Sequence, residues 1–168
     1  RQMCIRDRSG TVVTFKPDKS IFQQTTEYSY DTLASRMREL AYLNKGITIT
    51  LTDKRHKDEE GNDVSEVFYS EEGLKEFVRF LDGSRNPIIG HVIAMEGEKN
   101  DIPVEVAMIY NDSYAENLHS YVNNINTHEG GTHLSGFRRG LTSTLKKYAD
   151  ASGMLDKLKF EIAGDDFR

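Results

Sequence analysis

Alternation between apolar and polar positions predicts strands in the first half of the chain. Residues 11–15 (TVVTF) are β-branched or aromatic, and Pro17 ends this segment because proline cannot donate to a β-ladder. Residues 47–51 (ITITL) alternate strictly, which is the period-two pattern of a half-buried strand. We expect the return strand at residues 67–69, after an exposed, charged hairpin loop at residues 54–63.

Apolar spacing of three or four residues predicts three helices. Asp31 is a good capping residue for the first, which Gly46 closes. A shorter helix is expected at residues 71–81, and a long one runs from Thr132, a possible cap, to about Ala149. The apolar faces are formed by Leu33, Met37, Leu40 and Ala41 in the first helix, by Leu74, Phe77, Val78 and Leu81 in the second, and by Leu134, Phe137, Leu141, Leu145 and Tyr148 in the third.

Further strands are predicted in the second half of the chain. Residues 92–98 and 102–111 form an expected hairpin around an Asn-Asp pair, and a third strand is expected at residues 118–122. A polar, glycine-bearing loop at residues 123–131 then leads into the long helix. The whole pattern indicates an α+β fold, in which two groups of strands and helices meet near Ser70.

Composition narrows the class of protein. The 168 residues are 37% hydrophobic and 29% charged, an ordinary globular mixture, and no run approaches the roughly 20 apolar residues of a membrane helix. The single cysteine, Cys4, excludes a disulfide framework and favours a reducing, cytoplasmic compartment. Because the net charge is -5, any DNA contact requires a local basic patch. Residues 1–8 (RQMCIRDR) show no periodicity, and we expect them to be disordered or non-native.

A polar cluster precedes the long helix. His128, Glu129 and His133 are residue types that bind zinc, but two glycines separate the histidines, which do not share a helix face. A metal hydrolase built on them is therefore a weaker interpretation than a polar helix entrance, and we expect no metal site. The turn at residues 129–133 could bind an anion through free N–H groups, although a tight turn explains its glycines more simply.

One side of the long helix is positively charged. No acidic residue lies between Thr132 and Ala149, and at about 100° per residue the cations fall opposite the apolar face. The small side chains of Ser135, Thr142 and Ser143 would let a phosphate backbone approach between them. A solvated helix face is the alternative interpretation. The candidate DNA-binding residues are Arg138, Arg139, Lys146 and Lys147.

Three blocks of sequence resemble the B subunit of bacterial DNA gyrases. Their order and spacing match that family, and the last block is specific to gyrase and its close relative topoisomerase IV. The charged loop at residues 58–62 and the block at residues 73–78 resemble the gyrases of Bacteroides-type bacteria. The three blocks are residues 10–18 (GTVVTFKPD), residues 38–46 (RELAYLNKG), and residues 123–133 (NNINTHEGGTH) with 136–138 (GFR).

The resemblance implies a domain organisation and partners. Residues 9–70 resemble the C-terminal part of a GHKL-type ATPase domain, which is an α/β sandwich. Residues 71–168 resemble the N-terminal part of a transducer domain, a β-sheet with packed helices. The complete protein would use ATP and Mg²⁺ to couple hydrolysis to DNA strand passage and negative supercoiling. Its implied partners are a second B subunit in an ATP-dependent dimer clamp, the gyrase A subunit and double-stranded DNA.

The resemblance also assigns site residues. Thr11 resembles the threonine in the hydrogen-bond network around adenine, and Gly10 adjoins it. Because transducer basic residues line the cavity that holds DNA, the resemblance favours DNA contact by the basic helix face, centred on Arg138. The catalytic glutamate and the glycine-rich lid would precede residue 9, and the lysine that reaches the γ-phosphate would follow residue 168. We therefore expect the 168-residue chain alone to be inactive.

Two departures and two alternatives qualify the resemblance. Gly140 and Ser143 stand where alanine and arginine are expected, and a glycine inside a helix costs about 1 kcal/mol relative to alanine. One alternative is the B subunit of topoisomerase IV. The other is a non-enzymatic interaction module that reuses the transducer fold.

Overall fold

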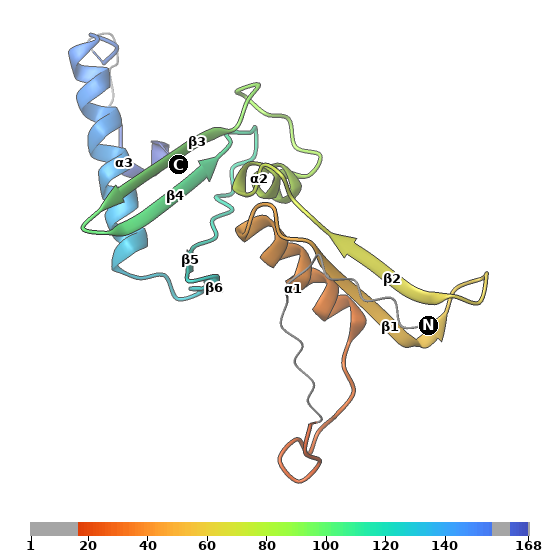
Figure 1. Cartoon of the computed structure of the whole chain (residues 1–168). Helices are drawn as coiled ribbons and strands as arrows, with labels where there is room; N and C mark the ends of the chain where they lie inside the picture. The colour runs from red at the N-terminus through yellow and green to blue at the C-terminus, as the bar shows by residue number, and fades with distance from the viewer. Residues whose placement is uncertain (1–16, 156–161, 168) are drawn as a thin grey trace.

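The computed structural model describes residues 17–155 and 162–167, so the strand predicted at residues 11–15 lies outside the described part. The described strands pair as three antiparallel hairpins. In Figure 1, α1 and the β1–β2 hairpin lie on one side of α2, and the β3–β4 hairpin and α3 lie on the other, which confirms the α+β class. The elements are α1 (Tyr30–Leu43), β1 (Ile49–Lys57), β2 (Asp63–Phe68), α2 (Leu74–Asp82), β3 (Ile93–Lys99), β4 (Ile102–Met108), β5 (Tyr121–Val122), β6 (Ile125–Asn126), α3 (Thr132–Ala151) and the 3-10 helix η1 (Gly164–Phe167).

Helix α1 packs on one face of the β1–β2 hairpin. The alternation predicted for β1 is confirmed, because Thr50 and Thr52 are exposed while their neighbours turn toward α1. The helix begins earlier than predicted, since the Ser29 hydroxyl, not Asp31, caps it by accepting from the Thr32 N–H at 3.4 Å. Buried Ala34, Ala41 and Phe68 form the core here, with Tyr30, Met37, Ile49 and Leu51 packed against them.

The β1–β2 hairpin is longer than its sequence suggests. Strand β1 continues to Lys57, past an irregularity in register between Asp53 and Lys57, and β2 begins at Asp63, so half of the loop predicted at residues 54–63 is strand. The true turn is held by the Asp58 carboxylate, which accepts the backbone N–H groups of Glu60 and Asn62 at 3.0 and 2.8 Å. The sequence pattern did not predict this longer strand, because the added residues are charged. An exposed two-stranded ribbon requires no alternation of apolar residues.

Asparagine-rich turns shape the second half. The predicted β3–β4 hairpin is confirmed, with Asn100 and Asp101 in the left-handed region at φ 53° and 60°. The strand predicted at residues 118–122 is wrong in extent, because only Tyr121–Val122 is strand and it pairs with Ile125–Asn126 inside the predicted loop. Asn123 and Asn124 supply the connecting turn at φ 50° and 64°, a conformation that asparagine tolerates better than most residues.

Helix α2 connects the two groups. It begins after Gly73, slightly later than predicted, and its apolar residue Phe77 is buried as expected. The Phe77 ring stacks on Tyr42 of α1, with ring centroids 5.2 Å apart. Ser70, which is almost fully buried, accepts the Gly73 N–H at 2.9 Å and donates to Glu76 at 2.8 Å, so the link between β2 and α2 is tightly held.

Candidate nucleic-acid interface

Helix α3 has well-defined ends. Its first backbone bond runs from the Ser135 N–H to the Gly131 carbonyl at 3.0 Å. A Cβ at Gly131 would lie 2.8 Å from the His133 imidazole, so a larger residue there would displace the ring. The other end is closed by Gly153 at φ 68° and by the Met154 N–H, which donates to the Ala149 carbonyl at 3.0 Å.

The packed face of α3 is turned relative to the prediction. Leu134, Phe137, Leu141 and Leu145 are half-buried as expected. Tyr148 is 64% exposed and Ala149 is buried instead, so the prediction that Tyr148 faces the core is wrong. The 3-10 helix η1 also packs against α3 and brings Gly164 beside the Thr142 side chain.

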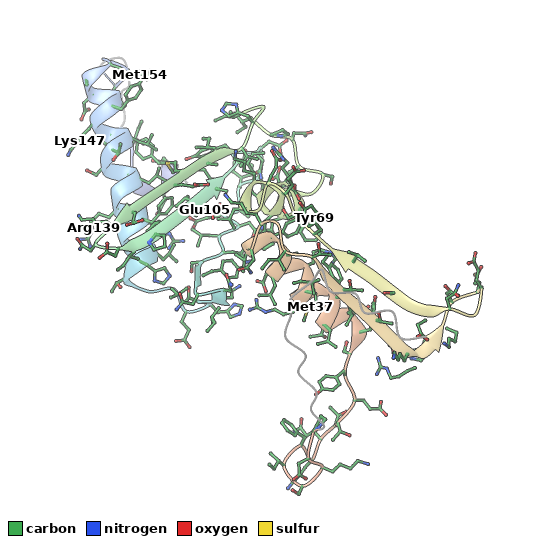
Figure 2. The ribbon with its side chains drawn as sticks, viewed as in Figure 1. Met37, Tyr69, Glu105, Arg139, Lys147 and Met154 are labelled. Carbon is green, nitrogen blue, oxygen red and sulfur yellow. The ribbon has the colours of Figure 1, made fainter. Side chains whose placement is uncertain are left out.

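The four predicted basic residues share one open groove of about 580 Å³ along α3. Arg139 and Lys147 are exposed, and Ser143 lies between them, four residues from each. In Figure 2, Arg139 lies beside the first half of α3 and Lys147 lies toward its C-terminal half. Ser135 does not line the groove. The lining residues are Arg138, Arg139, Thr142, Ser143, Lys146, Lys147 and Asp150.

Arg138 differs from the other three cations. Its guanidinium donates to the Glu116 carboxylate at 2.6 Å, and both side chains are about one-third exposed. The Arg138 Nε is buried and has no hydrogen-bond partner among the described residues. Arg138 therefore lies at the edge of the packed face. Glu116 could not be found from sequence, because it lies in a loop 22 residues away with no periodic pattern linking it to α3.

The remaining cations are available to a ligand. Within residues 17–155 and 162–167, no carboxylate forms an ion pair with Arg139, Lys146 or Lys147. Asp150 lines one end of the groove but pairs with none of them. Among the described residues, the groove therefore holds three unpaired cations on one helix, of which Arg139 and Lys147 are exposed and Lys146 is half-buried.

The structure shows no second site among the candidate residues that it describes. Gly10 and Thr11 lie outside the described residues. His133 Nε2 lies 3.1 Å from the Thr127 hydroxyl, as suits a polar helix entrance, while His128 and Glu129 are exposed. No group of three potential metal ligands occurs among the described residues. Likewise, none of the described helices has the length and apolar character needed to cross a membrane.

Comparison with known proteins identifies the family. Residues 73–168, more than half of the chain, match the family model described as DNA gyrase B. This chain belongs to the DNA gyrase B family. A DNA gyrase B subunit from Eisenibacter elegans is 64% identical over 162 residues, which are 96% of this chain and 34% of that protein. The chain therefore spans about a third of the length of such gyrase relatives.

Other gyrase B proteins extend the comparison. The DNA gyrase B subunit of Cytophaga hutchinsonii is 60% identical over 96% of this chain and 34% of that protein, and Bacteroidetes members among the relatives confirm the resemblance noted above. The 43K ATPase domain of Thermus thermophilus gyrase B, solved with an aminocoumarin, aligns with a TM-score of 0.75 and 28% identity. That alignment covers 90% of this chain and 40% of the Thermus chain, which confirms the predicted fold.

Proposed function

We propose that this chain is part of the ATP-driven B subunit of a DNA gyrase and that α3 contacts the phosphates of duplex DNA. The observation that carries the DNA proposal is the convergence of Arg139, Lys146 and Lys147 on one groove, without a paired carboxylate among the described residues. The names of the relatives favour gyrase over topoisomerase IV and over a non-enzymatic module.

The spacing of these residues fits a phosphate backbone. Arg139, Ser143 and Lys147 are four residues apart, so at about 1.5 Å of rise per residue they span roughly 12 Å of helix. Duplex DNA carries a negative charge about every 1.7 Å along its axis, so several phosphates fall within that span. Arginine and lysine both bind phosphate, and backbone contacts carry no direct sequence information. The contact is therefore independent of DNA sequence.

The proposed function also includes a domain organisation, a nucleotide site and partners. Residues 9–70 form the end of the ATPase domain and residues 71–168 the start of the transducer domain, which is supported by a family match that begins at residue 73. Gly10 and Thr11 contribute to the adenine side of a site for ATP and Mg²⁺. The partners of the complete, cytoplasmic protein are the gyrase A subunit, together with another copy of the B subunit and double-stranded DNA.

DNA-stimulated ATP turnover of a complete B subunit tests the proposed DNA contact. In a full-length B subunit that carries this sequence, the combined substitution Arg139→Gln, Lys146→Gln and Lys147→Gln should lower DNA-stimulated ATP turnover severalfold, because three phosphate contacts are lost. Turnover without DNA is the internal reference. A control with equal charge loss on exposed residues elsewhere, Lys19→Gln, Lys54→Gln and Lys75→Gln, should retain the stimulation. Undiminished stimulation in the α3 variant would contradict the proposed DNA contact.

A further inference from the structure

A polar seam joins α1 to the β5–β6 hairpin, although the two are about 80 residues apart. The Arg36 guanidinium donates to the Asn124 carbonyl at 2.7 Å, and the Tyr121 hydroxyl donates to Glu39 at 2.5 Å. The Asn124 side-chain amide donates to the Asn44 side chain at 2.9 Å. Arg36 and Glu39 also pair with each other on α1, so the seam is one connected network.

The hairpin depends on this seam for its placement. Each of its strands has only two residues, and an isolated hairpin is marginal even at greater length. The left-handed conformation of Asn123 and Asn124 forms the turn whose Asn124 carbonyl accepts from α1. On its other side, the Tyr121 ring lies 6.2 Å from the buried Phe77 ring of α2. Contacts with α1 and α2 therefore stabilise a turn that the hydrogen bonds between β5 and β6 stabilise only weakly.

The charge on Glu39 strengthens the hydrogen bonds of the polar seam. Burial raises the pKa of Glu39, but hydrogen bonds from Tyr121 and Arg36 outweigh this effect and leave the Glu39 pKa below its ordinary value. Burial and the hydrogen bond to Glu39 both raise the pKa of Tyr121. At neutral pH a charged carboxylate therefore accepts from a protonated phenol, and such charge-assisted bonds are stronger than neutral ones.

Hydrogen bonds continue from the hairpin to α3. The Thr127 N–H donates to the Ser120 carbonyl at 2.8 Å, which closes the strand pair at its open end. The Thr127 hydroxyl donates to the same carbonyl at 3.0 Å and lies 3.1 Å from His133 Nε2. Because His133 belongs to the first turn of α3, a chain of contacts runs from α1 to the start of the basic helix.

We propose that Arg36, Glu39 and Tyr121 are positioning residues that form a joint through which α1 sets the placement of the first turn of α3. The direction of the basic face then follows the position of α1. The joint concerns contacts within the chain, and it stands whether or not α3 binds DNA.

Amide hydrogen exchange in the 168-residue chain tests the joint. Tyr121→Phe removes one hydroxyl and keeps the ring against Phe77. The Thr127 and Ser135 amides, which mark the end of the hairpin and the first bond of α3, should then exchange about tenfold faster, the scale of one lost hydrogen bond. Tyr69→Phe is the matched control, because Tyr69 is exposed and its hydroxyl has no hydrogen-bond partner among the described residues.

The outcomes separate a joint from a local contact. Faster exchange at both amides, with wild-type exchange in β1 and β2, supports the joint. Wild-type exchange at Ser135 overturns it, even if Thr127 exchanges faster. If Tyr121→Phe speeds exchange throughout the chain, Glu39→Gln decides, because it keeps an oxygen for Tyr121 and removes the charge together with the oxygen that accepts from Arg36. If the joint exists, Glu39→Gln speeds exchange of the Thr127 and Ser135 amides. Unchanged exchange at these amides overturns the proposal.

Discussion

At the scale of single residues, burial and partners decide what a charge can do. Arg138 and Arg139 are adjacent and chemically identical, and the sequence predicts both as DNA-binding residues. The structure separates them, because Arg138 is half-buried and paired with Glu116, while Arg139 is exposed. A phosphate must compete with Glu116 for Arg138 but meets no such competitor at Arg139 among the residues that the structure describes. Helical periodicity could place both residues on a face, but it could not reveal a partner from another loop.

The Asp53 carboxylate gives a pH-dependent prediction. It is buried, and side-chain hydrogen bonds from Arg55 at 2.7 and 2.9 Å, aided by the Arg55 N–H, hold its pKa well below the ordinary value of about 3.9. A carboxylate with a lowered folded-state pKa stabilises the fold above about pH 4, and this contribution is lost as the pH falls through the folded-state pKa. Asp53→Asn should therefore lower the Tm at pH 7 and flatten its fall between about pH 5 and 2.

Thermal unfolding across that pH range measures the effect. Asp101→Asn, at the exposed β3–β4 turn, is the control and should follow the wild-type curve. A parallel fall in Tm for wild type and Asp53→Asn would show that the Arg55 contacts do not stabilise the fold.

At the scale of elements, apolar periodicity predicted the long helices and strands and missed the two-residue strands. The three helices and the β3–β4 hairpin repeat their pattern over seven or more residues, so several positions agree. The two-residue strands β5 and β6 have no room for a period, and contacts with α1 and α2 hold them. Helix ends were also shifted, because Ser29 caps α1 with its hydroxyl and Gly131 is the N-cap of α3 without a side chain, and apolar spacing encodes neither.

Two glycines of α3 give opposite predictions. A Cβ at Gly140 would meet open space, so Gly140→Ala should stabilise the chain by about 0.5–1 kcal/mol, the helix-propensity difference. Gly131→Ala should destabilise it, because the new Cβ would lie 2.8 Å from the His133 ring and displace it from Thr127. Urea unfolding of both variants gives the free energy of unfolding. Equal effects of the two substitutions would contradict this account of the helix entrance.

At the scale of the whole molecule, two groups of elements meet at α2 and at the polar seam. The sequence predicted the α+β class and two groups of elements that meet near Ser70, because the long helices and strands show clear apolar periodicity. Family resemblance predicted the gyrase B fold, and the comparisons confirm it. The seam could not be predicted, since Arg36 and Asn124 are 88 residues apart and neither belongs to an apolar pattern.

The salt dependence of DNA binding tests whether the basic face of α3 binds phosphates. The association constant of the 168-residue chain for a short duplex can be measured by fluorescence anisotropy between about 50 and 200 mM salt. Each lost phosphate contact should reduce the slope of log K against log salt by about 0.9, so Arg139→Gln, Lys146→Gln and Lys147→Gln together should reduce it by about 2–3. Arg138→Gln should change it less than any one of them, because Glu116 already occupies that guanidinium. The control Lys19→Gln, Lys54→Gln and Lys75→Gln, with the same net charge, should keep the wild-type slope. An identical slope for wild type and the α3 triple variant would show that this face of α3 binds no phosphates.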